Sequence, residues 1–145
     1  TLENLTAYLS HYAVEYFQNT SVECELRLPP EMPHCALSSE TRHNLFLTFE
    51  EALNNVLKHS GATKVKVEMT LAALEFEIKI TDNGKGFEIP SSPDKNDSTR
   101  GGRGGNGLKN MRQRLTAVGG ECFISSRPGA SAVITLLIRL NPAGR

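Results

Sequence analysis

The sequence lacks the features that identify several common classes of protein. Its three cysteines, Cys24, Cys35 and Cys122, are an odd number with no metal-ligand spacing, which indicates reduced thiols in a cytosol. The longest apolar run, near residues 134–138, is too short to span a bilayer. The first residues have neither the basic end nor the apolar stretch of a signal peptide. We therefore expect a cytoplasmic domain that does not itself contact a membrane.

The sequence also has no net charge, with 16 Lys and Arg residues against 16 Asp and Glu residues among 145. This balance argues against a dedicated nucleic-acid-binding protein, and the length is typical of one domain. The net charge of zero nevertheless results from two parts of the chain with opposite net charges. Residues 1–93 hold 7 basic and 13 acidic residues, a net charge of −6, and residues 94–145 hold 9 basic and 3 acidic residues, a net charge of +6.

Hydrophobic periodicity predicts helices over residues 2–18, over residues 39–59 and from Leu108 to Val118. Gly61 is expected to end the second helix. Strict alternation over two segments predicts half-buried antiparallel strands, and three further strands are expected. The predicted strands cover residues 22–28, 64–69, 74–81, 121–127 and 131–140. The fold class is therefore α+β, with helices on one face of a mixed, mostly antiparallel sheet.

Along the second predicted helix, Glu51, Asn55 and Lys58 share a face turned away from the apolar stripe, with His59 near its edge. Such a stripe is most often a solvated helix face. The functional alternative is a base, a metal ligand and two phosphate-facing groups in a row. Asparagine suits Mg²⁺, because this ion keeps several waters and prefers phosphate oxygens to a full protein cage.

Asp82 follows the apolar residue Ile80 in the alternation, so it is predicted to lie on the core face of its strand. A carboxylate there is costly unless a donor pairs with it, and an exocyclic amine of a ligand would do so. The alternative is a tight turn at a strand end, where Asp, Asn and Gly are common. Gly84 and Gly86 follow closely and favour the ligand site, because glycines allow a ligand to approach the backbone.

A second group of glycines precedes the third predicted helix. Five of the twelve glycines fall within residues 101–107, after a polar stretch, and we expect roughly residues 85–105 to form one long mobile loop. Residues 105–108 would then lie at a helix N-terminus, which attracts anions, with Lys109, Arg112 and Arg114 adding positive charge. The alternative is a flexible linker.

Taken in order, these segments resemble the motifs of the GHKL ATPase superfamily, which contains histidine kinases, gyrase-type ATPases and heat-shock chaperones. Residues 51–59 resemble its N box, residues 82–87 its first glycine box and residues 105–115 its second. Within the superfamily, the last of these, together with Gly119-Gly120 and residues 126–129, is similar to the nitrate-sensor-like and lipid-sensor-like bacterial histidine kinases.

The resemblance implies a Bergerat-type ATP-binding sandwich, and it assigns roles to residues of the first half of the chain. Glu51 would be the general base or proton acceptor, Asn55 would hold Mg²⁺, and Lys58 and His59 would face phosphates or ribose. Asp82 would accept a hydrogen bond from the adenine amino group.

The resemblance also implies roles for the two glycine boxes and the segment between them. Gly84 and Gly86 would line the adenine pocket. Residues from about 87 to 104 would form the ATP lid. The backbone amides near Gly105, Gly107 and Leu108 would meet the phosphates.

Two departures from the family pattern are present. Where the family ends its last turn with Pro-Gly-x-Gly-Thr, residues 128–132 read Pro-Gly-Ala-Ser-Ala, which puts a phosphate or packing contact in doubt that Ser131 could partly replace. The four histidines precede Tyr, Cys, Asn and Ser, so none has the Asp that usually follows a phosphoacceptor histidine. The chain therefore looks like the catalytic domain of a longer two-component kinase, inactive in autophosphorylation by itself.

The implied partners are the dimerisation and histidine-phosphotransfer domain of the same kinase and the receiver domain of a response regulator, with the membrane anchoring of the parent protein left open. Two alternatives are an anti-sigma-factor-like serine kinase and a non-catalytic module that binds nucleotide or docks partners. Residues 2–18 and the Met111–Arg114 segment favour the histidine kinase. A nucleic-acid role for the basic half lacks an aromatic platform beside the arginines.

Overall fold

Five strands form one mixed sheet in the computed structural model, which describes residues 1–32, 35–84, 103–126 and 131–140. The strands are β1 (Glu23–Arg27), β2 (Lys64–Ala72), β3 (Glu75–Asp82), β4 (Glu121–Ser125) and β5 (Ala132–Arg139). Their order in the sheet is β1-β2-β3-β5-β4. Strand β1 pairs with β2 in parallel, and the other neighbours pair antiparallel.

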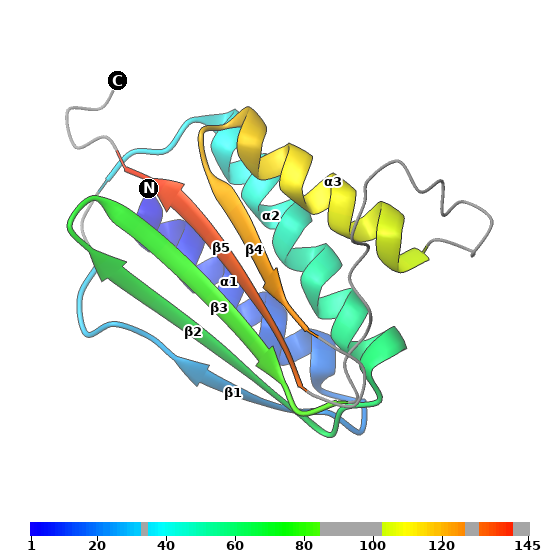
Figure 1. The fold of residues 1–145 in the computed structure, drawn as a ribbon. Helices are drawn as coiled ribbons and strands as arrows, with labels where there is room; N and C mark the ends of the chain where they lie inside the picture. Colours follow the sequence, from blue (N-terminus) through cyan, green and yellow to red (C-terminus); the bar gives the residue numbers. More distant parts are fainter. Residues whose placement is uncertain (33–34, 85–102, 127–130, 141–145) are drawn as a thin grey trace.

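The helices all cover one face of this sheet (Figure 1). They are α1 (Leu2–Phe17), α2 (Ser39–Asn55), the π-helical turn η1 (Val56–Ser60) and α3 (Arg103–Ala117). The N-cap Ser38 side chain accepts a hydrogen bond from the Thr41 amide at the start of α2, and Gly61, with a φ of 70°, ends η1. The predicted two-layer α+β sandwich is therefore confirmed. No helix within the described residues is long and apolar enough to cross a membrane.

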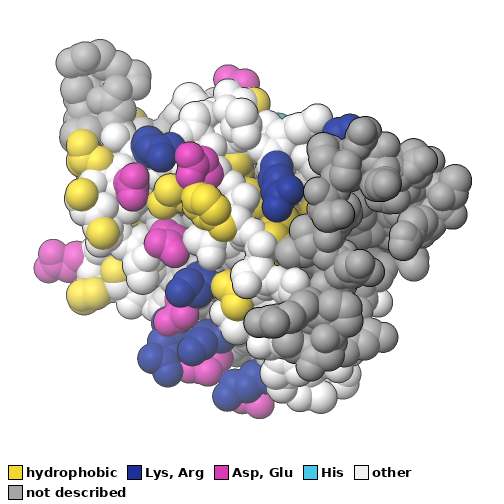
Figure 2. All heavy atoms as spheres, viewed as in Figure 1, with side chains coloured by type: hydrophobic (Ala, Val, Ile, Leu, Met, Phe, Trp, Pro, Cys, Tyr) yellow, Lys and Arg dark blue, Asp and Glu magenta, His cyan; other side chains and the backbone are white. Residues whose placement is uncertain are grey.

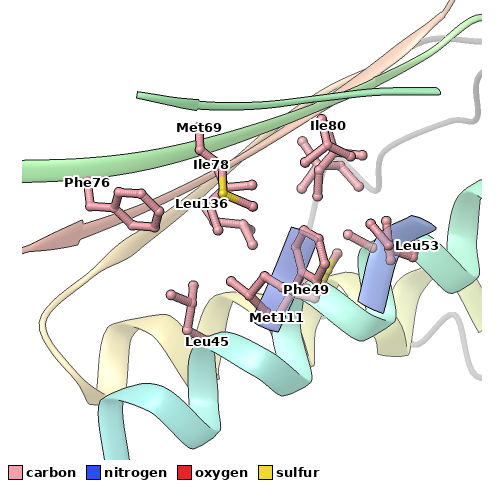
Figure 3. Packing of buried hydrophobic residues seen from close by; sticks show 14 of the residues in the cluster. Leu45, Phe49, Leu53, Met69, Phe76, Ile78, Ile80, Met111 and Leu136 are labelled. Carbon is pink, nitrogen blue, oxygen red and sulfur yellow. The ribbon is translucent and has the colours of Figure 1, made fainter. Parts of the chain in front are cut away.

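The core lies between the two layers (Figure 3). Leu45, Phe49 and Leu53 extend from α2 and Met111 extends from α3, toward side chains of the sheet such as Ile78. All five are buried. These α2 positions recur at helical spacing and the buried strand positions alternate, so the sequence pattern and the packing agree.

The opposite face of the sheet carries interspersed acidic and basic side chains (Figure 2). Glu68 and Lys79 are directly opposite each other on β2 and β3, and Lys64 lies 3.6 Å from the Glu25 carboxylate. Opposite charges across neighbouring strands stabilise a sheet modestly. The charged half of the alternating pattern therefore lies on this face of the sheet.

Two local expectations differ from the structure. Helix α3 begins at Arg103, so Gly107 lies in its second turn and not at its N-terminus, as the glycine pattern had predicted. The second helix does not remain α-helical to His59, because η1 replaces its last turn, and the angle of 100° per residue holds only to Asn55. Residues 85–102 of the predicted loop lie outside the described residues.

We expect Gly120→Ala to destabilise the domain. A Cβ at this position would collide with the backbone carbonyl oxygen of Leu137 and lie 3.4 Å from that of Leu115, which already accepts a hydrogen bond from the Gly120 amide. Backbone atoms of β5 and α3 cannot rotate away, so the overpacking should cost about 2 kcal/mol or more. Thermal denaturation should show a melting temperature lower by roughly 4–8 °C.

The matched control is Gly119→Asn. Gly119 has a φ of 79° with no atom within 4 Å of an added Cβ, and asparagine tolerates this left-handed conformation. Its melting temperature should stay close to that of the unmodified chain. Equal melting of Gly120→Ala and the unmodified chain would contradict the close approach of β5.

Candidate functional site

The polar stripe of α2 is not an ordinary solvated helix face. Asn55 is 7% exposed and Glu51 is half-buried, one turn apart on α2, whereas Lys58 is exposed on η1. A solvated stripe would leave the asparagine open to water, so the sequence alternative of a merely exposed face does not describe Asn55. The side chain of His59 lies outside the described residues.

Glu51 lies against the second glycine box. A Cβ built on Gly107 would lie 2.5 Å from the Glu51 Oε2 atom, so a side chain at this position would require the Glu51 carboxylate to move. Gly107 and Leu108 are both buried. The structure thus brings together α2 and α3 at Glu51 and Gly107, which are more than fifty positions apart in the sequence.

Asp82 lies on the core face of β3, as its place in the alternation predicted. Its side chain is 5% exposed, and the residues two, four and six positions before it are also buried. One carboxylate oxygen accepts a hydrogen bond of 2.8 Å from the Gly84 amide. Burial raises the pKa of Asp82 above its usual value, and hydrogen bonds from the backbone of Gly84 and Ala132 oppose this shift in part. The Asp82 carboxylate is therefore a buried hydrogen-bond acceptor with capacity for a further donor.

The end of β3 and the end of η1 lie at the same end of the molecule (Figure 1). Strand β2 begins at Lys64, shortly after η1 ends, and its residue Val65 pairs with Asp82. The carboxylate of Asp82 is therefore tied through two strands to the helical segment that carries Asn55. Gly86 lies outside the described residues. Gly105 lies in the first turn of α3, and its surroundings are outside the described part of the chain.

A magnesium ion at this site would depend on oxygen ligands other than a carboxylate cluster. Among the described residues, no three His, Cys, Asp or Glu side chains gather so that they could hold a metal ion. The buried Asn55 amide offers one oxygen. This donor set fits an ion that retains waters and takes its remaining ligands from phosphates.

Two tyrosines of α1, to which the sequence analysis assigned no role, make polar contacts beside the site. The Tyr12 hydroxyl donates to Glu50 at 3.1 Å, and the Tyr16 hydroxyl donates to Asn54 at 3.2 Å. Glu50 and Asn54 immediately precede Glu51 and Asn55, so α1 holds the flank of the α2 polar stripe. The common spacing of four residues on both helices was the signal that could have revealed these pairs.

Comparison with known proteins gives a match to one family model and to sensor proteins of bacteria. Residues 40–142 match a family model described as "Histidine kinase-, DNA gyrase B-, and HSP90-like ATPase". The sensor protein VraS of Staphylococcus saprophyticus is 35% identical over 98 residues, which make up 68% of this chain and 26% of that protein. The chain therefore spans about a quarter of the length of this relative.

Solved structures show the same fold. The histidine kinase domain of a blue-light activated histidine kinase from Erythrobacter litoralis EL346 matches with a TM-score of 0.71 and 18% identity, over 94% of this chain and 61% of that one. The catalytic domain of the histidine kinase ThkA matches with a TM-score of 0.72 and 16% identity, over 99% of this chain and 95% of that one. At these identities the likeness establishes the fold alone.

We expect Tyr12 to titrate at an unusually high pH. Burial and the hydrogen bond to Glu50 raise its pKa from 10.0 to about 12. Because the folded pKa exceeds the unfolded one, the stability that this protonated hydroxyl contributes is complete below pH 10.0 and is lost as the pH rises toward about 12. Ultraviolet absorbance of tyrosinate should resolve the step, since the chain has three tyrosines and no tryptophan.

Three variants test this assignment. Tyr12→Phe should remove the highest titration step, and Glu50→Gln should move it to lower pH. Tyr8→Phe, which removes an exposed tyrosine from the same helix, should leave the highest step in place. A highest step that persists unchanged in Tyr12→Phe would show that the Tyr12–Glu50 contact does not control the titration.

Proposed function

Because the chain belongs to the family of histidine kinase-, DNA gyrase B- and HSP90-like ATPases, we propose that it binds Mg·ATP and donates the γ-phosphoryl group to a histidine on a separate domain. The family implies ATP binding, and the chain is a catalytic ATPase domain of the sensor histidine kinase type. Within that type, the form of the second glycine box supports a place among the nitrate-sensor-like and lipid-sensor-like kinases.

The observation that carries the proposal is the juxtaposition of Glu51 and Gly107. It joins the N box on α2 to the second glycine box on α3, which supports Glu51 as the proposed general base. Asn55 lies one turn along the same helix and would hold Mg²⁺, which neutralises phosphate charge when bound. Catalysis of phosphoryl transfer consists largely of such positioning and charge neutralisation.

Asp82 would recognise the base of the nucleotide. Its buried carboxylate would accept a hydrogen bond from the adenine amino group, while the Gly84 amide fixes the orientation of the carboxylate. Gly84 and Gly86 would line the adenine pocket. A donor from the ligand would offset part of the cost of burying this charge.

The basic part of the chain would face the phosphates. Gly105 lies in the first turn of α3, where backbone amides have no helical acceptors and attract anions. Gly107 and Leu108 lie further along the helix, and Gly107 is beside Glu51. Lys58 and His59 would approach the phosphates or ribose from η1, and residues from about 87 to 104 would close over the nucleotide as a lid.

The acceptor would be the dimerisation and phosphotransfer domain of a longer kinase, and the phosphate would pass from its histidine to the receiver domain of a response regulator. We place this domain in the cytoplasm, where ATP is available. The test is to mix the purified chain and labelled ATP with phosphoacceptor domains of this kinase class. Labelled histidine supports the proposal. Labelled serine in a small antagonist protein would indicate the anti-sigma-factor type, and nucleotide binding without transfer would indicate a non-catalytic module.

Nucleotide binding should raise the thermal stability of the chain. At a ligand concentration of 100 times the dissociation constant, Mg·ADP should add about 2.7 kcal/mol to the free energy of unfolding. Asp82→Ala should abolish this shift because the adenine acceptor is lost. Glu51→Ala should retain the shift and lose phosphotransfer, because the base is not needed for binding.

Glu75→Ala is the matched control, since this carboxylate lies on the far end of β3 and pairs with Arg139. It should change neither binding nor transfer. If the unmodified chain shows no shift at millimolar nucleotide, ATP binding is disproved. If Asp82→Ala and Glu51→Ala both bind and transfer normally, the residue roles are wrong.

A further inference from the structure

Asn83 is an exposed residue whose side chain makes three hydrogen bonds. Its Oδ1 atom accepts hydrogen bonds from the backbone amides of Thr63 and Lys64, each at 3.0 Å, and its Nδ2 atom donates to the Thr63 hydroxyl at 3.1 Å. The Asn83 amide also donates to the Lys64 carbonyl at 3.2 Å. Four hydrogen bonds thus join one residue to two residues about twenty positions earlier.

These hydrogen bonds lie where two segments of the candidate site meet, the one that follows η1 and the one that follows β3. Thr63 and Lys64 follow Gly61, which ends η1, so they connect the segment carrying Asn55 and Lys58 to the sheet. On its other side, Asn83 stands between Asp82 and Gly84, the proposed adenine acceptor and the residue whose amide orients it. Asn83 therefore joins the first glycine box to the segment that connects the N box to β2.

The regular pairing of β2 with β3 stops one residue before Asn83. The pairing of β2 with β3 ends at Val65 and Asp82, and beyond this pair the Asn83 side chain satisfies two amides that would otherwise have no strand partner. The Thr63 carbonyl accepts a hydrogen bond from the Glu23 amide at 2.9 Å, so the same residue also anchors β1. Asn83 thus fixes a point where three strands meet.

We propose that Asn83 is a positioning residue for adenine recognition, a role that rests on the proposed nucleotide site. It does not contact the nucleotide. It holds the backbone of Asp82 and Gly84 in place relative to β2, and hydrogen bonding to a base is directional. When Asn83 is lost, the carboxylate keeps its charge and its place in the chain but loses its fixed orientation.

Loss of the Asn83 side chain should affect recognition of the nucleotide base more than recognition of the phosphates. Adenine presents an amino donor to Asp82, whereas guanine presents a carbonyl acceptor at the same ring position, which a carboxylate repels. A loosely held carboxylate discriminates less between the two. Asn83→Ala should therefore weaken Mg·ADP binding by about tenfold, as expected for hydrogen bonds to a charged group, and should change Mg·GDP binding little.

The test measures the dissociation constants of Mg·ADP and Mg·GDP by calorimetry for the full 145-residue chain and its variants. Asn83→Asp keeps both bonds accepted from the amides, and the Thr63 hydroxyl can turn to donate to the new carboxylate, so this variant should retain nearly full affinity and selectivity. Thr63→Val removes only the partner of Nδ2 and should have a small effect. Asn19→Ala, at an exposed asparagine after α1, is the matched control and should have none.

Amide hydrogen exchange provides a second measurement. The Thr63 and Lys64 amides should exchange faster in Asn83→Ala and keep their protection in Asn83→Asp. This result would show, independently of nucleotide binding, that both amides donate to the residue 83 side chain. If Asn83→Ala is too unstable for calorimetry, Asn83→Ser, which retains a smaller acceptor, takes its place in both measurements.

The outcomes are distinct. If the unmodified chain binds no Mg·ADP, the proposed function fails and the positioning role, which rests on it, fails with it. If it binds, and the variant that removes the side-chain bonds keeps the same ratio of ADP to GDP affinity, the positioning role is overturned. A lower melting temperature with an unchanged ratio would likewise show that Asn83 serves only the stability of the fold.

Discussion

The candidate site depends on how one apolar stripe of α2 is buried against the sheet. Leu45, Phe49 and Leu53 are at most 1% exposed, and fully burying each such side chain contributes about 1.5–3 kcal/mol. Rotation of α2 about its axis would expose this stripe, so the hydrophobic core sets the direction in which Glu51 and Asn55 point. The geometry of the polar residues is thus fixed by side chains that take no part in any chemistry.

The sheet contributes the second fixed direction. Asp82 continues the buried face of β3, and the residue after it is bonded to the start of β2, so the two functional segments meet where helix and sheet are joined. The far face of the same sheet is covered with charges of both signs (Figure 2). One face of the sheet therefore packs the core and carries the candidate site, and the other face is exposed to water.

The sequence was sufficient for the parts of the structure that follow a regular period. The apolar stripe of α2, the strand alternation and the burial of Asp82 were all predictable, because each depends on a repeat of 3.6 or 2 residues. It was insufficient where local geometry departs from the period. The π-helical turn after Asn55 and the start of α3 at Arg103 shift boundaries by a few residues, and the bonds of Asn83 and the contact between Glu51 and Gly107 arise from segments far apart in the chain.

The raised pKa of Asp82 links the stability of the domain to pH and, under the role proposed for this residue, to its ligand. Because its folded pKa lies above the unfolded one, ionisation of Asp82 lowers the stability of the domain as the pH rises through that interval. A proton on this carboxylate removes the cost of burying its charge, and a hydrogen bond from an amino group of the proposed base would offset part of that cost when the carboxylate is ionised. The folding free energy that is lost on ionisation would therefore be regained in part on binding.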